Sequence, residues 1–200
     1  AMTGEVRLVE LVGKLGQELS EGEIIQLNNT NASNFSEDVY FEVIKKKTAA
    51  LFATAAEAGA ISVKSTDKMA EISRQFGELI GISFQIKDDI FDYYSSDVLG
   101  KPTGNDMREG KLTLPVLYVL NTLRNPSMIE LALKIRALDA SDEEIAYFID
   151  YVKQNGGIEY ATKVMKEYRN KALAVLPETI SEELKLALTS FIDYVIERNK

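Results

Sequence analysis

The sequence predicts an all-α protein, and three observations support that prediction. Apolar residues recur at the spacing that places them on one side of a helix with about 3.6 residues per turn. Residues that start or end helices stand at the boundaries of these segments, and no segment alternates like a half-buried strand. The 200 residues are 46% hydrophobic and can bury a sizeable core. We therefore expect one helical bundle that forms a single domain over residues 1–200.

The first two helices are long and have clear boundary signals. Apolar residues at helical spacing extend the first from Val6 to about residue 27, where a polar, turn-forming run follows. Ser36 offers an N-cap for the second helix, which we expect over residues 37–58, with Gly59 as its C-terminal stop.

The third helix should begin near Asp67 and continue to about Ser95. Gly77 and Gly81 lie one turn apart on it. This spacing lets a neighbouring helix approach closely, so we interpret both glycines as packing residues.

The second half of the chain begins with a long loop over residues 96–112. Thr113 can cap the next helix with Pro115 in its first turn, where the missing N–H does no harm. Pro126 and Ser141 open two further helices. The remaining helices are expected over residues 158–176 and 181–198.

The composition excludes several classes of site. The chain has no Cys and no His, which rules out disulfides, thiolate metal sites, the commonest zinc ligand and a serine–histidine triad. Any metal must therefore be held by carboxylates, which favours Mg²⁺ or a relative.

Net charge and hydropathy limit the expected partners and location. The net charge of −8 and pI near 4.8 argue against a nucleic-acid partner, which requires a basic face. No run of 18 apolar residues exists, so we expect no transmembrane segment. No signal peptide is recognisable at the start, and a cytoplasmic protein is expected.

An acidic motif near the end of the third predicted helix is the most informative feature. Asp88, Asp89 and Asp92 fall within about 100° of arc on one helix face, and Gln85 lies one turn earlier on that face. Crowded carboxylates raise one another's pKa and require a counter-charge. Mg²⁺ takes such oxygen ligands and keeps positions for water and substrate phosphates. The motif therefore favours a metal site.

The simpler interpretation is that these acids form a solvated helix face. Apolar residues argue against it because they surround the helix on nearly all sides, so the helix should be buried and its acids partnered. These residues are Phe84, Ile86, Ile90 and Phe91.

The loop that follows carries positive charge suited to phosphate. Lys101 and Lys111 suit the phosphate oxygens that a metal leaves uncovered, although solvated loop lysines are the plain alternative. Asp106 and Arg108 are expected to tie the loop together. The motif and the loop together predict a metal–diphosphate site.

Three sequence blocks resemble the trans-isoprenyl diphosphate synthase family, also called polyprenyl synthetases. The blocks are YFEVIKKKTAALF, GISFQIKDDIFD and GKPTGNDMREGKLTLP. The resemblance extends over nearly all of the chain and matches the C-terminal part of the family's proteins. It implies an antiparallel bundle of the isoprenoid synthase type that lacks its N-terminal helices. The stretch SEGEIIQL and the residues around Lys47 resemble the long-chain branch more than the short-chain one.

The resemblance implies roles for individual residues. Asp88, Asp89 and Asp92 would bind Mg²⁺, with Asp88 the most direct ligand. The substrate-binding residues implied are Lys47, Thr48, Gln85, Lys101 and Lys111. The residues implied to be catalytic are Lys47, Lys101 and Asp88. Spacing alone would make Lys47 one exposed helix lysine among three, and only the resemblance singles it out.

The implied reaction joins an allylic prenyl diphosphate to isopentenyl diphosphate with Mg²⁺ as cofactor, and the family implies a homodimer. The family's first Asp-rich motif and its Gly-Gly-Lys-Arg segment are missing here, since Asp88–Asp92 is the only D-D-x-x-D in the chain. We therefore expect a C-terminal fragment that is inactive alone. The alternatives are a non-catalytic regulatory subunit of a heteromeric synthase and, with less support, a class I terpene cyclase.

Overall fold

The computed structural model describes residues 4–30, 34–94 and 103–197 of the chain. All regular elements in these ranges are helical and none is a strand, which confirms the all-α prediction. The described residues group into two compact units, one from residues 1–24, 42–85 and 165–199 and the other from 25–41 and 86–164. The single domain over residues 1–200 stays a prediction.

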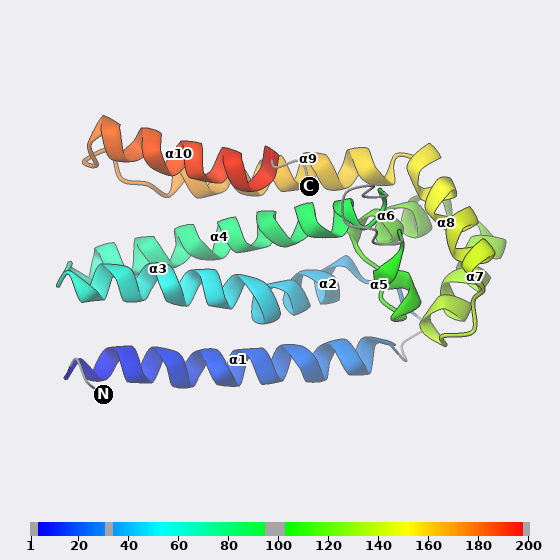
Figure 1. Cartoon of the computed structure of the whole chain (residues 1–200), viewed down its shortest axis with the longest axis horizontal. Helices are drawn as coiled ribbons and strands as arrows, with labels where there is room; N and C mark the ends of the chain where they lie inside the picture. The colour runs from blue at the N-terminus through cyan, green and yellow to red at the C-terminus, as the bar shows by residue number, and fades with distance from the viewer. Residues whose placement is uncertain (1–3, 31–33, 95–102, 198–200) are drawn as a thin grey trace. The chain divides into compact units, whose positions relative to one another are not determined.

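The helices follow one another along the chain as Figure 1 labels them. They are α1 (Val6–Thr30), α2 (Glu37–Ile44), the π-helical turn η1 (Lys45–Ala49), α3 (Ala50–Ser62), α4 (Asp67–Phe91), α5 (Asn105–Arg108), α6 (Leu114–Leu123), α7 (Pro126–Arg136), α8 (Asp142–Gln154), α9 (Gly157–Ala174) and α10 (Glu182–Glu197). Within the described ranges, no helix combines the length and the apolar character needed to cross a bilayer.

Several predicted details of the helices were wrong. α4 ends at Phe91 and not near Ser95, so Asp92 lies just beyond it. The helix expected over 37–58 is divided by η1, and it passes through Gly59 to end at Ser62. A glycine inside a helix costs only about 1 kcal/mol, so Gly59 need not end one. The left-handed residue after the helix is instead Lys64, at φ 56°. The loop expected over 96–112 contains the short helix α5.

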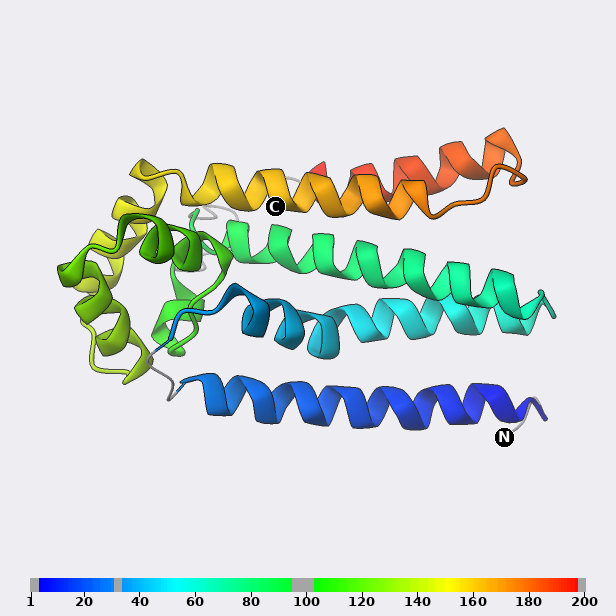
Figure 2. The ribbon, with the colours of Figure 1, turned by 180° about the vertical axis from the view of Figure 1, so that it is seen from behind.

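In the first unit, α3 and α4 lie side by side, as Figures 1 and 2 both show. A Cβ on Gly77 would lie 2.4 Å from the Phe52 carbonyl oxygen, and one on Gly81 would lie 2.6 Å from the Ala49 Cα. The two backbones therefore approach as closely as glycine permits, which confirms the packing role predicted for both glycines.

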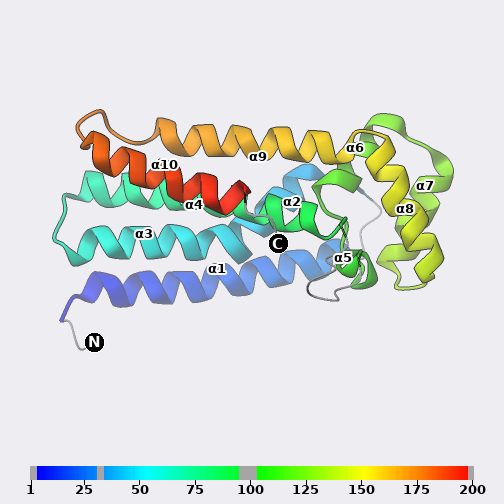
Figure 3. The same cartoon turned by 45° about the horizontal axis from the view of Figure 1, so that its top comes forward.

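The core of the first unit also includes the C-terminal helices. Phe76 and Ile80 of α4 form a buried cluster with Ala172 of α9 and Ile192 of α10. Figure 3 shows α10 lying along α9 and α4. The first part of α4 is thus a packing element.

In the second unit, the predicted helix starts are observed. α6 begins after Thr113 with Pro115 in its first turn, and Pro126 is the first residue of α7. Ser141 and Glu144 form a reciprocal capping box at the start of α8, with N···O distances of 3.2 and 2.9 Å. The starts of α7 and α8 therefore carry side-chain caps, from Asn125 and Ser141, whereas Thr113 makes no capping hydrogen bond at the start of α6.

Candidate active site

The acidic motif lies where α4 ends in the second unit. Asp88 is half-buried, Asp89 is 4% exposed, and Asp92 follows the last residue of the helix. Ile86 and Ile90 are buried, whereas Phe84 and Phe91 are partly exposed, so the burial predicted for this helix end is confirmed for two of its four apolar residues.

Tyr40 of α2 contacts the middle carboxylate of the motif. Its hydroxyl donates a hydrogen bond to Asp89 Oδ2 at 2.6 Å. Burial raises the pKa of Tyr40 well above its usual range, and the negative charge of Asp89 raises it further. Tyr40 therefore stays protonated and available as a donor at neutral pH.

Asp92 holds the start of α5. Its Oδ1 accepts a hydrogen bond from the Asn105 N–H at 3.0 Å, and its Oδ2 accepts one from the Asp106 N–H at 3.1 Å. The Gly104 N–H donates to the Asp92 carbonyl at 2.8 Å. The third aspartate of the motif thus fixes the segment that leads to Lys111.

Negative charge accumulates around Asp106. Its pKa rises to about 6, first because burial disfavours the charged carboxylate and second because Asp92 is close, with a smaller contribution from Asp88. Lys111 opposes the rise. These groups form an acidic cluster in which a cation would be favoured.

Of the two predicted loop lysines, Lys111 lies within the described residues. Lys111 donates through its backbone N–H to the Asp106 carbonyl at 2.8 Å, and its ammonium group pairs with Glu109. Lys101 lies outside the described residues. Its substrate role stays a prediction.

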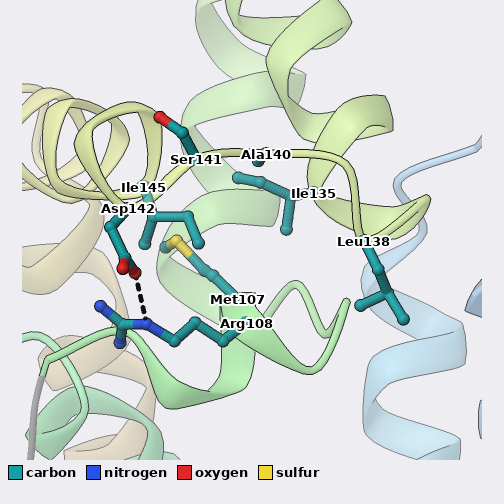
Figure 4. Close-up of a pocket in the computed structure, with 8 residues that line it drawn as sticks. All are labelled: Met107, Arg108, Ile135, Leu138, Ala140, Ser141, Asp142 and Ile145. Atoms are coloured by element: carbon teal, nitrogen blue, oxygen red, sulfur yellow. Dashed lines mark hydrogen bonds and ion pairs between the residues drawn. The ribbon is translucent and has the colours of Figure 1, made fainter.

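Arg108 holds its own loop through a hydrogen bond to the Thr103 carbonyl, as expected from the sequence, and it also ties α5 to α8. Its Nε donates to Asp142 Oδ1 at 2.8 Å beside a pocket of about 310 Å³, which Figure 4 shows. Gly104, at φ 78°, packs against Ile145 and Ile149 of α8. The end of the acidic loop is therefore attached to a neighbouring helix.

The predicted residues Lys47, Thr48 and Gln85 lie in the first unit. Thr48 Oγ1 donates to Gln85 Oε1 at 2.7 Å, so the structure brings these two residues together. Lys47 forms an ion pair with Glu23. Lys47 and Thr48 both belong to η1, and π-helical turns inside α-helices occur frequently at functional sites.

Sequence reasoning missed two residues that contact the candidate site. Tyr40 could have been found because a buried tyrosine hydroxyl needs a partner. Gly22 lies in α1 where a Cβ would come within 2.8 Å of Lys46 Cβ and of Lys47 Cγ. Gly22 could have been noticed in the sequence because a glycine inside a predicted helix often marks close packing or a functional contact.

The carboxylates of the acidic motif are the oxygen donors available to Mg²⁺. Among the described residues, no group of three or more His, Cys, Asp or Glu side chains is arranged to hold a metal ion. Mg²⁺ usually takes only one or two carboxylates and completes its shell with water and substrate phosphates. The oxygen donors and the accumulated negative charge fit such an ion. The ligand roles of Asp88, Asp89 and Asp92 stay predictions.

Comparison with known proteins defines the class. A sequence model of the polyprenyl synthetase family matches residues 1–152, and the chain therefore belongs to the polyprenyl synthetase family. This confirms the resemblance and the fold that it implied. An octaprenyl diphosphate synthase of Haemophilus influenzae is 32% identical over 205 residues, covering 100% of this chain and 60% of the relative. That relative supports the long-chain type.

Two solved structures share the fold. A geranylgeranyl pyrophosphate synthase of Bacteroides thetaiotaomicron is 49% identical with a TM-score of 0.93, covering 98% of this chain and 65% of that one. A polyprenyl synthase of Caulobacter crescentus, complexed with calcium and isoprenyl diphosphate, is 30% identical with a TM-score of 0.91, covering 100% and 61%. The chain thus spans less than two thirds of each of these relatives.

Proposed function

We propose that this chain carries part of the active site of a Mg²⁺-dependent prenyltransferase, which joins an allylic diphosphate to isopentenyl diphosphate and makes a longer trans-polyprenyl diphosphate. The acidic cluster at the end of α4 carries the proposal, because its oxygen donors suit a hard divalent cation. The calcium and isoprenyl diphosphate in the Caulobacter crescentus relative support the same pairing of ligands.

The aspartates would hold the cation. Asp88 is the most direct ligand in this proposal, and Asp89 and Asp92 complete the acidic face. Bound Mg²⁺ would act as a Lewis acid toward the diphosphate.

The lysines would bind the allylic diphosphate. Lys47 and Lys101 contact it in this proposal, and Lys111 adds positive charge nearby. Their charges stabilise the negative charge that grows on the diphosphate as the allylic C–O bond breaks. Lys47 is paired with Glu23 in the structure, so diphosphate would compete with that carboxylate for it.

Thr48 and Gln85 would line the reacting end of the allylic chain. The double bond of isopentenyl diphosphate attacks the allylic cation and forms the new C–C bond. A proton then leaves the product, and the released diphosphate can accept it, so the reaction needs no histidine.

These 200 residues alone should not elongate a prenyl chain. They contain one acidic motif, and electrostatic catalysis requires charges held in place around a water-excluded substrate. A homodimeric, cytoplasmic enzyme remains our expectation for the complete protein.

The test supplies Mg²⁺, farnesyl diphosphate and labelled isopentenyl diphosphate to the complete protein that contains this chain. Labelled, elongated prenyl diphosphate is expected, and the 200-residue chain assayed in parallel should give none. Product from the 200 residues alone would overturn the proposed inactivity. If the complete protein makes no product but activates another synthase, the alternative of a regulatory subunit is correct.

A further inference from the structure

The second unit contains a buried contact between a tyrosine and an aspartate that the predicted roles do not use. We infer that Tyr40 is a positioning residue of the metal site, which holds the Asp89 carboxylate in its ligating orientation. This inference rests on the proposed function, because it assigns Tyr40 to the same metal site.

The contact has the properties of a strong, fixed hydrogen bond. Tyr40 is 7% exposed and Asp89 is 4% exposed, so neither group exchanges its partner readily for water. The O···O distance of 2.6 Å is typical of a hydroxyl that donates to an ionised carboxylate. A buried carboxylate needs such a partner, because its desolvation is otherwise costly. Tyr40 therefore fixes the position of the Asp89 carboxylate.

The structure also fixes Tyr40 itself. Ser36 Oγ accepts from the Val39 N–H at 3.3 Å at the start of α2, and the Tyr160 hydroxyl donates to Glu37 Oε2 at 2.8 Å. The Tyr40 ring lies edge-on to Phe41, with ring centroids 5.3 Å apart. A donor mounted on a short, anchored helix can orient the carboxylate of a distant helix without reorganising.

Outer hydrogen bonds of this kind usually matter to metal affinity. Partners that orient ligating carboxylates typically contribute about 10- to 100-fold in metal affinity or activity. A hydrogen bond that only stabilised the fold would change the melting temperature and leave the affinity of the folded protein unaltered. The two explanations therefore predict different results for Mg²⁺ binding.

The experiment titrates Mg²⁺ into the complete protein in the presence of inorganic diphosphate, by calorimetry well below the melting temperature. Tyr40→Phe removes one oxygen and should weaken Mg²⁺ binding about 10-fold. Tyr151→Phe is the control, because it also removes one tyrosine oxygen, but that hydroxyl accepts a hydrogen bond from Asn125 and, within the described residues, makes none with Asp89 or α2. Its Mg²⁺ affinity should equal that of the wild type.

A double-mutant cycle tests whether Tyr40 acts through Asp89. Asp89→Asn should weaken Mg²⁺ binding, and adding Tyr40→Phe to it should cause little further loss. Equal Mg²⁺ affinity in wild type and Tyr40→Phe, or additive losses in the cycle, would overturn the positioning role. If Asp88→Ala still abolishes binding in that case, the proposed metal site survives. If the wild type binds no Mg²⁺ with diphosphate, the site and the positioning role both fail.

Discussion

The two parts of α4 differ in what their polar and small residues do. In the first unit, Gly77 and Gly81 let α3 approach, and Phe76 and Ile80 lie in the core. In the second unit, the last turns of the same helix carry aspartates that contact Tyr40 and α5. The comparison teaches that a single continuous helix can separate packing from chemistry along its length. Substitutions in the first part should change stability, and substitutions in the last turns should change activity.

The largest expected effect is at Asp88. In the complete protein, Asp88→Ala should lower turnover by orders of magnitude, because a cation acting as a Lewis acid contributes several kcal/mol to the transition state. The melting temperature should change little, since Asp88 is only half-buried. Steady-state kinetics and thermal melting on the same preparations check both parts. Near-native turnover would remove Asp88 from the site.

The second effect concerns the packing part of α4. Gly77→Ala should lower the free energy of unfolding by about 2–3 kcal/mol, because the new Cβ would overlap the Phe52 backbone. Gly13→Ala in α1 is the control: nothing lies within 4 Å of its Cβ position, so it should gain about 0.5–1 kcal/mol. Denaturant unfolding measures both. A Gly77→Ala protein as stable as the wild type would contradict the close packing of α3 and α4.

The third prediction concerns Tyr93, a buried residue that directly follows Asp92 in the chain. Tyr93 is 2% exposed, and no hydrogen bond of normal length and angle reaches its hydroxyl from the described residues. Burial raises its pKa, although Thr113 opposes the rise. Because an unpartnered buried hydroxyl is unfavourable, Tyr93→Phe should leave the stability unchanged or raise it by about 1 kcal/mol. A loss of stability by denaturant unfolding would show that the hydroxyl has a partner.

The smallest expected effect is that of Gly22→Ala in α1. It tests whether a packing contact in α1 also affects a proposed substrate-binding residue. Gly22→Ala would press on Lys46 and Lys47, whose carbons lie within 2.8 Å of the new Cβ. Because Lys46 Cβ is bound directly to its backbone, the two helices must move apart slightly, and we expect a cost of about 1 kcal/mol, equivalent to a rise of about fivefold in KM for the allylic diphosphate. Comparison with Gly16→Ala, whose Cβ position has open space, isolates the contact. Equal KM values in the two variants would exclude a role for Gly22 in placing Lys47.

The helices were predictable because their signals are local. Apolar periodicity and caps such as Ser141 depend on residues within a turn or two, and the structure bears them out. The placement of Asp88 and Asp89 on the last turn of α4 was predictable for the same reason, whereas Asp92 follows the end of the helix. The π-helical turn at Lys45–Ala49 was not, since the sequence there reads as an uninterrupted helix.

The partners of the aspartates could not be predicted because they are remote in the chain. Tyr40 and Asp89 lie 49 residues apart, and Asp92 reaches Asn105 across 13 residues. Helical periodicity shows which face a carboxylate occupies but gives no information on what meets that face. Only the fold shows that Asp89 and Asp92 carry structural contacts as well as charge.

The central claim is that the last turns of α4 bind a divalent cation together with diphosphate. Calorimetric titration of Mg²⁺ into the complete protein with inorganic diphosphate tests it most directly, with Asp88→Ala and Gly13→Ala as paired variants. The account predicts saturable Mg²⁺ binding in the wild type and in Gly13→Ala, and its loss in Asp88→Ala. Equal binding in Asp88→Ala and the wild type would contradict it.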